Sequence, residues 1–284
     1  MIVEGISRIN APAKLNLNLR VTGRRDDGYH LLDSVVVFTG FGDRIELEPA
    51  QEDSVAVTGE FASSVGIGVE NICFRALAAF RDYGGVAGCH SINIDKRIPV
   101  GAGLGGGSSD AAVILLYLNR RSPAPLTDTR LAEAALSLGA DVPVCLAGIA
   151  QRMQGIGDIL TPVDPVPHGH LVLAKTDVML PTGEVFQSLR ESGFKEAAPL
   201  RSSEISGSVP DIIAAGNNLQ AAAMSLSPDV ARVIGRLRDS NGVIAAQMSG
   251  SGAACFGLFN NGDDAAAAAE NLAQDGVWAV ATRF

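Results

Sequence analysis

The chain has 284 residues, of which 47% are hydrophobic and 19% charged, and its formal net charge is −9 at pH 7. This composition excludes an intrinsically disordered or fibrous protein. The acidic balance argues against nucleic acid and an anionic membrane surface as partners, because both select a basic protein face. A small anionic ligand remains open, since backbone dipoles can hold one locally.

The cysteines and the apolar runs indicate a cytoplasmic protein without a membrane anchor. The four cysteines form no C-x-x-C pair and each lies in an apolar run, so we expect buried, reduced thiols. The N-terminal stretch MIVEGISRIN does not resemble a signal peptide. The longest apolar run, residues 111–118, is far shorter than the roughly 20 residues that span a bilayer.

In the first half of the chain, strands and helices are predicted in turn. Alternating apolar and polar residues at 14–21 (KLNLNLRV) predict a half-buried strand on which Lys14 and Asn16 share one face. The turn-rich stretch GRRDDGYH follows this strand. Further alternating stretches predict strands, and apolar spacing predicts helices, the second of them capped by Asp128. The strands are expected at 31–38, 43–49, 54–59 and 89–99, and the helices at 71–83 and 127–138.

A change of composition at 162–169 (PVDPVPHG) predicts a domain boundary, which gives an N-terminal domain at 1–160 and a C-terminal domain at 161–284. In the second half we expect strands at 170–175 and 277–284 and helices at 183–192, 211–226, 228–240 and 263–274. Residues 243–259 predict a strand, a glycine turn and a second strand. Because strands and helices do not alternate regularly, we expect an α+β fold in both halves.

The most informative segment is PVGAGLGGGSSDAA at residues 99–112, which matches G-x-G-x-x-G and precedes a helical pattern. A dinucleotide-binding turn would need an acidic residue at the end of a second strand about 20 residues on, and a loop stands there instead. A Walker loop would need Gly-Lys-Ser/Thr, which does not occur. A flexible loop explains the glycines but not the two serines at a helix start. A loop whose amides, with the helix N-terminus, wrap a phosphate chain explains both.

Two other segments favour a phosphoryl-transfer site if they lie near this loop. One is the strand face with Lys14 and Asn16, although a lysine on a strand is commonly a solvated edge charge. The other is the GADVP segment, whose Asp141 follows a predicted helix and by itself would be read as a turn residue.

Together these segments resemble the GHMP kinase family, named for galactokinase, homoserine kinase, mevalonate kinase and phosphomevalonate kinase. The resemblance covers about the full length. The combination of P-A-K-L-N-L, D-G-Y-H and G-A-D-V-P is similar to the branch of the family that phosphorylates 4-diphosphocytidyl-2-C-methyl-D-erythritol. The segments that carry it are 12–38 (PAKLNLNLRVTGRRDDGYHLLDSVVVF), 99–112, 138–146 (LGADVPVCL) and 248–259 (MSGSGAACFGLF).

The resemblance implies a two-domain α+β architecture with a ribosomal protein S5 domain 2-like N-terminal domain, a ferredoxin-like C-terminal domain and an active site in the cleft between them. It implies ATP-dependent phosphorylation of the substrate's 2-hydroxyl, giving the 2-phosphate and ADP, in the non-mevalonate pathway of isopentenyl diphosphate synthesis. ATP and Mg²⁺ would be the cofactors, the cytidine diphosphate-linked methylerythritol the only other partner, and the protein a monomer or weak homodimer.

The resemblance also implies the roles of single residues. Asp141 would be the general base, and Lys14 would hold the substrate and stabilise charge. Ser108 or Ser109 would lie near magnesium, and Ser108 would be the residue that contacts it, with the phosphates. Residues that contact ATP would be Asn71, Pro99, Gly101, Gly103, Leu104, Gly105, Gly106, Gly107, Ser108 and Ser109. Residues that contact the substrate would be Asn16, Tyr29, His30, Thr182, Phe186, Gly250, Ser251 and Gly252.

Two alternatives remain at this point. Another GHMP kinase, acting on homoserine, mevalonate or a sugar, is disfavoured by D-G-Y-H and by Phe186, since those substrates have no nucleobase to stack. A nucleotide-binding relative without catalysis is disfavoured because Lys14 and Asp141 are both present. Two departures from the family pattern are Asp158, where glutamate is expected, and residues 195–209, which match poorly and resemble a mobile surface segment.

Overall fold

The computed structural model describes residues 6–284, so the first residues of the stretch compared with a signal peptide lie outside the described part. The chain forms two compact units. Unit 1 comprises the chain up to Lys14, residues 42–100 and residues 105–148; unit 2 comprises residues 15–41, 101–104 and 149–284. The domain boundary between residues 160 and 161 stays a prediction, and unit 2 combines segments from both sides of it.

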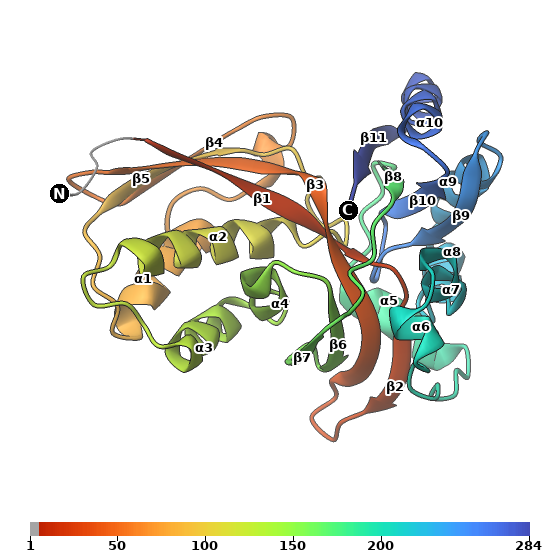
Figure 1. Cartoon of the computed structure of the whole chain (residues 1–284), viewed down its shortest axis with the longest axis horizontal. Helices are drawn as coiled ribbons and strands as arrows, with labels where there is room; N and C mark the ends of the chain where they lie inside the picture. Colours follow the sequence, from red (N-terminus) through yellow and green to blue (C-terminus); the bar gives the residue numbers. More distant parts are fainter. Residues whose placement is uncertain (1–5) are drawn as a thin grey trace. The chain divides into compact units, whose positions relative to one another are not determined.

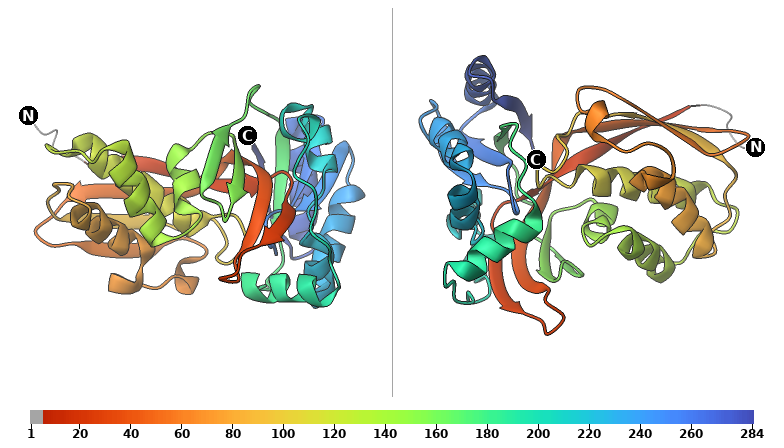
Figure 2. Two further views of the ribbon diagram at one scale, coloured as in Figure 1. Left: turned by 90° about the horizontal axis from the view of Figure 1, so that it is seen from below. Right: turned by 180° about the vertical axis from the view of Figure 1, so that it is seen from behind.

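Unit 1 is a sheet with helices on one side (Figure 1). Strand β5 (His90–Asp95) pairs in parallel with β4 (Ser54–Thr58) and antiparallel with the second half of β3 (His30–Pro49), and β1 (Ser7–Asn16) also pairs with β3. The α-helices are α1 (Ile72–Asp82), α2 (Gly106–Arg121), α3 (Asp128–Leu138) and α4 (Val142–Ala147), and the short 3₁₀ turns are η1 (Ala62–Ser64) and η2 (Gly68–Glu70). Both views of Figure 2 show these four α-helices gathered together. The layered core of unit 1 is apolar, and Phe80 is among its fully buried side chains.

Local signals explain where the helices of unit 1 begin. Asn71 accepts a hydrogen bond from the backbone N–H of Cys73 and so caps α1, a position where asparagine is a preferred residue. The cap of α3 is Thr127, whose hydroxyl accepts from the N–H of Arg130. The prediction that Asp128 caps this helix is therefore wrong by one position, because Asp128 is already its first helical residue.

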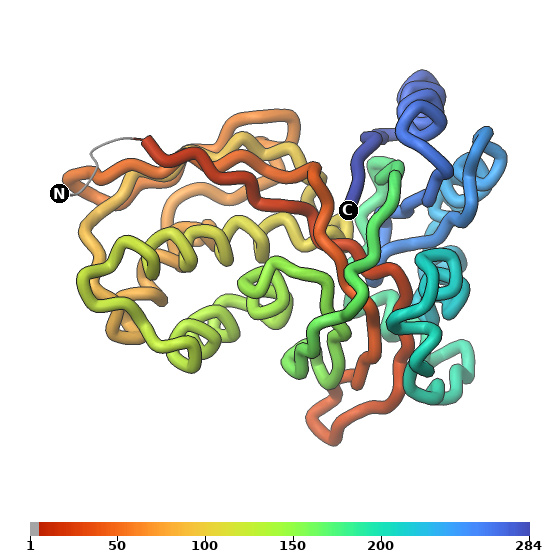
Figure 3. Tube along the Cα trace, viewed as in Figure 1, coloured from red at the N-terminus to blue at the C-terminus, as the bar shows by residue number. Residues whose placement is uncertain are grey.

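Unit 2 contains a four-stranded antiparallel sheet in the order β11-β8-β10-β9. With helices between β8 and β9 and between β10 and β11, this is the β-α-β-β-α-β order of the expected ferredoxin-like fold. Figure 3 shows the green trace of β8 beside the dark blue trace of β11. The strands are β8 (His170–Lys175), β9 (Val243–Met248), β10 (Cys255–Phe259) and β11 (Trp278–Arg283). The helices are α5 (Thr182–Glu191), α6 (Ser203–Ser206), α7 (Val209–Ala214), α8 (Gln220–Leu226), α9 (Pro228–Arg238) and α10 (Gly262–Gln274).

The rest of unit 2 is built on the first half of β3. This half pairs with β2 (Arg20–Arg24) and with β6 (Gln151–Gly155), and β6 pairs with β7 (Ile159–Pro162). The apolar core of unit 2 includes side chains of β8, α5, α9 and α10. The α+β expectation is thus confirmed in both units.

Three expectations differ from the structure. The strand predicted at 14–21 ends at Asn16, and its polar face is buried as well as its apolar face. The helix predicted at 211–226 is interrupted between α7 and α8, where Gly216 has a φ of 80° and Asn217 donates to the carbonyls of Met248 and Gly250. Strands β6 and β7 were not predicted.

Residues 195–209 are not simply a mobile surface segment. The N–H of Leu200 donates to the buried carboxylate of Asp33, which is also paired with Arg152. Glu204 in α6 is buried and pairs with Arg20 at 3.0 Å. These polar anchors join the segment to the strands that precede and include β3. Within residues 6–284, no helix is both long and apolar enough to cross a membrane.

Candidate active site

Lys14 and Asp141, which are 127 positions apart in the sequence, form an ion pair in unit 1. The Lys14 Nζ lies 2.9 Å from Oδ1 of Asp141, and the exposed fractions of the two side chains are 5% and 43%. Lys14 lies near the end of β1, and Asp141 directly precedes α4 without using its side chain to cap that helix. The carboxylate is therefore open to solvent while the ammonium supports it from the interior.

The glycine segment passes close to Lys14 of this pair within unit 1. Gly105 has a φ of 63°, and a Cβ atom there would lie 3.0 Å from Cβ of Lys14. The absent side chain lets the loop pass close to the Lys14 stem, and the positive φ favours glycine at this position. Lys14, Asp141 and the glycine segment, all distant in sequence, are thus brought together as expected.

The other glycines of the segment have different steric surroundings. A Cβ at Gly106 would lie 2.9 Å from Nζ of Lys96, whereas Gly107 meets only Ile72, at 3.5 Å. In unit 2, a Cβ at Gly103 would lie 2.9 Å from the carbonyl oxygen of Gly252. The side chains of Leu104 and Pro99 are buried and anchor the segment, and the contact of these residues with ATP stays a prediction. Several glycines of a phosphate-loop pattern therefore make room for protein atoms.

Helix α2 begins with the two serines on its first turn. Ser108 is partly exposed, whereas Ser109 is buried and its N–H donates to the carbonyl of Gly105 at 2.8 Å. A helix of 16 residues carries a partial positive charge at this end and presents free N–H groups there. This end can bind an anionic group, and Ser108 is the better placed of the two hydroxyls.

A buried cluster of three charges lies under this turn and was not found from the sequence. Lys96 pairs with Asp43 and, at 3.0 Å, with Asp110 of α2, and all three side chains are buried. Burial alone lowers the pKa of Lys96, but the charges of Asp110 and Asp43 outweigh this effect and raise it. Burial also raises the pKa of Asp110 to about 7, against the opposing charge of Lys96. The position of Lys96 at the end of an alternating strand does not predict that it is buried or paired with two carboxylates.

Asn71 has a structural role in unit 1 that the sequence did not predict. Its side chain is buried, caps α1 through Oδ1 and donates through Nδ2 to the carbonyl of Gly66 at 2.7 Å. Both polar ends of the amide are engaged within the protein, and its contact with ATP stays a prediction.

Asn16 in unit 2 has an unsatisfied polar atom. Its Nδ2 donates to the hydroxyl of Ser34 at 2.8 Å, and its Oδ1 finds no hydrogen-bond partner among the described residues. Gly250, with a φ of 56°, lies beside this oxygen, which a Cβ would approach to 3.3 Å. A buried acceptor without a partner is costly unless a ligand supplies the donor, so Asn16 fits a binding role.

The other predicted substrate residues of unit 2 form two contacts. The rings of His30 and Phe186 stack with centroids 4.4 Å apart and an interplanar angle of 17°. Thr182 and Ser251 are hydrogen-bonded through their hydroxyls at 3.0 Å, and Gly252, like Gly250, has a positive φ. Tyr29 is 61% exposed. His30 thus already covers one face of the aromatic ring expected to stack on the nucleobase.

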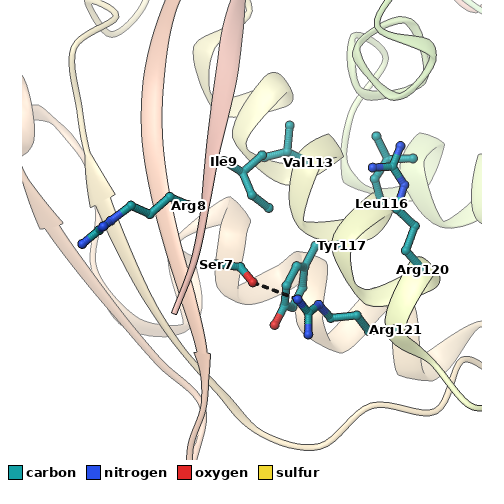
Figure 4. Close-up of a pocket in the computed structure, with 8 residues that line it drawn as sticks. All are labelled: Ser7, Arg8, Ile9, Val113, Leu116, Tyr117, Arg120 and Arg121. Atoms are coloured by element: carbon teal, nitrogen blue, oxygen red, sulfur yellow. Dashed lines mark hydrogen bonds between the residues drawn. The ribbon is translucent and has the colours of Figure 1, made fainter. Parts of the chain in front are cut away.

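A separate hollow of about 530 Å³ in unit 1 contains none of the predicted site residues. It lies between β1 and α2, where Arg121 donates to the hydroxyl of Ser7 and its guanidinium lies 4.9 Å from the Tyr117 ring centroid. Figure 4 shows Arg8 on the opposite side, pointing away from Tyr117. Ser7, Tyr117 and Arg121 are thus engaged with one another, and Arg8 pairs with Glu46, which is not part of the lining.

No cluster of three or more His, Cys, Asp or Glu side chains suited to a metal ion occurs in the described part of the chain. Asp110, the nearest carboxylate after the two serines, is paired with Lys96. These residues fit an ion such as Mg²⁺ that takes most of its ligands from water and phosphate oxygens, with Ser108 as the protein oxygen.

Comparison with family models divides the chain into two matching parts. Residues 71–149 match the GHMP kinases N terminal domain, and residues 205–277 match the GHMP kinases C terminal domain. The first match includes the glycine segment and Asp141.

Curated relatives match nearly the whole chain. The 4-diphosphocytidyl-2-C-methyl-D-erythritol kinase of Cereibacter sphaeroides is 43% identical over 96% of this chain and 98% of its own length. The kinase of the same name from Paramagnetospirillum magneticum is 45% identical over 93% of both chains.

Comparison with solved structures agrees with the comparison with curated relatives. A crystal structure of 4-(cytidine 5'-diphospho)-2C-methyl-D-erythritol kinase superposes with a TM-score of 0.82 at 35% identity and covers 98% of both chains. Homoserine kinase from Cytophaga hutchinsonii superposes with a TM-score of 0.69 over 100% of this chain and 95% of its own, but at 14% identity it shows the fold alone.

Proposed function

The chain belongs to the 4-diphosphocytidyl-2-C-methyl-D-erythritol kinases of the GHMP kinase family, and from that premise we propose that it phosphorylates the 2-hydroxyl of 4-diphosphocytidyl-2-C-methyl-D-erythritol. The products are the 2-phosphate and ADP, and the step belongs to the non-mevalonate route to isopentenyl diphosphate. The observation that carries this proposal is the Lys14–Asp141 ion pair at 2.9 Å, with Gly105 of the glycine segment against the Lys14 stem.

Asp141 acts as the general base. Its exposed carboxylate accepts the proton of the 2-hydroxyl as the hydroxyl oxygen forms its bond to the γ-phosphorus and the bond from that phosphorus to the ADP oxygen breaks. Lys14 is buried behind the carboxylate, so its charge is little screened by solvent. It holds Asp141 in position and attracts the negative charge that develops on the transferring group.

The start of α2 binds the phosphate chain of ATP. The segment 105–108 presents N–H groups and the positive end of the α2 dipole, and the missing side chain at Gly107 leaves the backbone accessible. Mg²⁺, bound through the phosphates and Ser108, would neutralise charge on the transferring phosphoryl group. The protein itself therefore supplies mainly position and fixed charge, which is what phosphoryl transfer requires.

The cytidine part of the substrate is bound by residues of unit 2. Asn16 offers a buried oxygen without a partner, and Phe186 offers an aromatic ring. Asn16 follows Lys14 by two positions on β1, so the two side chains emerge from the same face of one strand.

The four free cysteines support a reducing compartment such as the cytoplasm as the location of the protein.

Phosphorus NMR tests the substrate assignment. The purified protein is incubated with Mg-ATP and 4-diphosphocytidyl-2-C-methyl-D-erythritol, and a new phosphomonoester signal is expected together with ADP. Parallel samples contain homoserine, mevalonate or galactose as the acceptor. A phosphomonoester from one of these, with none from the cytidine substrate, would overturn the assignment.

Asp141→Asn tests the base. We expect kcat to fall by about 10²-fold or more with little change in the KM for ATP, because a general base contributes roughly 10²–10⁴. Asp128→Asn, which removes a carboxylate from the first residue of α3 in the same unit, is the matched control and should keep normal activity. A folded Asp141→Asn protein with activity within about tenfold of the wild type would contradict the role.

A further inference from the structure

A small hollow of about 160 Å³ lies beside His30 in unit 2 and carries an unusual set of charges. Two arginines line it, Arg24 of β2 and Arg190 in the last turn of α5, and Glu196 after α5 is the acidic residue of its lining. The apolar part of the lining includes Val21 and Phe194. Neither arginine was singled out by the sequence motifs.

The His30 ring is held in place at this hollow. Phe186 stacks on it at 4.4 Å, and His30 begins β3, where it pairs with Arg24 of β2. The Nε of Arg24 donates to the carbonyl of Gly28 at 3.3 Å, which ties this arginine to the turn before His30. The imidazole therefore has a restrained orientation with two guanidinium groups beside it.

A protonated imidazole would place a third positive charge around the same small hollow, facing one carboxylate. Burial first, and then the positive charges of Arg190 and Arg24, lower the pKa of His30. A neutral imidazole carries one N–H donor and one bare nitrogen that accepts a hydrogen bond, whereas the charged ring carries two donors. The exocyclic amino group of cytosine is a donor and needs the bare nitrogen.

We propose that Arg24 and Arg190 are positioning residues for nucleobase recognition, which keep the stacked His30 ring neutral so that its bare nitrogen accepts the amino group of a cytosine. This inference rests on the proposed function for the identity of the base. The arginines act through His30 and need no contact with the substrate. Their charge sets the lowest pH at which the base is still bound.

Both arginines are exposed, so their replacement leaves the apolar core intact. In Arg190→Gln and Arg24→Gln, we expect the acid-side rise in KM for the cytidine substrate to begin about half a pH unit higher, while kcat stays near the wild-type value. At a pH well below the midpoint of the His30 titration, this shift corresponds to a roughly threefold higher KM, and the ratio falls toward one as the pH rises. Arg190→Lys should restore the wild-type profile, and Arg232→Gln, an exposed arginine of α9 in the same unit, should have no effect.

A second measurement does not depend on turnover. The imidazole Hε1 proton of His30, assigned with His30→Gln, is followed by proton NMR from pH 4.5 to 8.5, and the titration midpoint should rise in both arginine variants. Unmoved midpoints and KM profiles, in a wild type that binds CDP by calorimetry, would overturn this inference alone. A wild type that neither binds CDP nor turns over the cytidine substrate would overturn the proposed function, and with it the base-recognition role.

Discussion

Gly106→Ala probes the buried cluster under the glycine segment. Gly106 and Gly107 are the first two residues of α2, and neither has a positive φ. A Cβ at Gly107 would have ordinary contact with Ile72 at 3.5 Å, but a Cβ at Gly106 would lie 2.9 Å from Nζ of Lys96 and 3.1 Å from a methyl carbon of Ile98. Adjacent glycines in one turn therefore have different steric surroundings.

The magnitude follows from what Lys96 would lose. Alanine is favoured over glycine in a helix by about 0.5–1 kcal/mol, and this gain applies to both positions. At Gly106 the ammonium must also move away from Asp43 and Asp110, and breaking a buried pair costs about 3–5 kcal/mol. Because Lys96 can shift and keep part of these contacts, we expect Gly106→Ala to lower the free energy of unfolding by about 2 kcal/mol. Gly107→Ala should raise it by about 0.5–1 kcal/mol.

Urea unfolding followed by far-ultraviolet circular dichroism, without nucleotide, measures both changes. Equal m-values would show that the variants and the wild type unfold between comparable states. If Gly106→Ala is as stable as Gly107→Ala, the Lys96 cluster does not determine the glycine at this position and the reasoning is wrong.

Two further predictions concern titratable groups. The pKa of Glu204 is lowered to about 2, first by the side-chain hydrogen bond from Arg201 and then by the hydrogen bond from the Arg201 backbone N–H. The Glu204 carboxylate therefore stabilises the fold fully above its unfolded pKa near 4.5. This contribution is lost as the pH falls toward 2. Urea titrations should therefore show a smaller loss of stability between pH 5 and pH 2.5 in Glu204→Gln than in the wild type; equal losses would contradict the assignment. In the folded protein a thiol reagent such as DTNB should react promptly with Cys89 alone, because the other three thiols are buried, and all four should react in urea. Prompt reaction of a second thiol would show that the folded core opens readily.

Much of the local structure was predictable because its causes are local. The glycine-rich segment and the serines after it placed the start of α2 within a few residues, and the short apolar runs at β8 and β10 placed those strands. The helix expected at 211–226 was wrong because its interruption depends on distant groups. Asn217 bonds to the carbonyls of Met248 and Gly250, and Asn218 accepts from the N–H of Val21.

The candidate site was likewise predictable only in part. The sequence motifs were sufficient to select Lys14, Asp141 and the glycine segment, because these residue types suit phosphoryl transfer and their pattern resembles one family. They were not sufficient to show that Lys14 is buried, since an alternating strand predicts that its polar face is exposed.

By itself, the sequence determined the family, the glycine-rich helix start and most strands and helices, because these depend on residue types at short spacings. Only the tertiary structure decided that Lys14 meets Asp141, that Lys96 fills the space beside Gly106, and that Arg190 lies near His30. Each of these contacts joins residues of different elements or loops, and its energy depends on burial and distance. Neither quantity is defined until distant segments pack together.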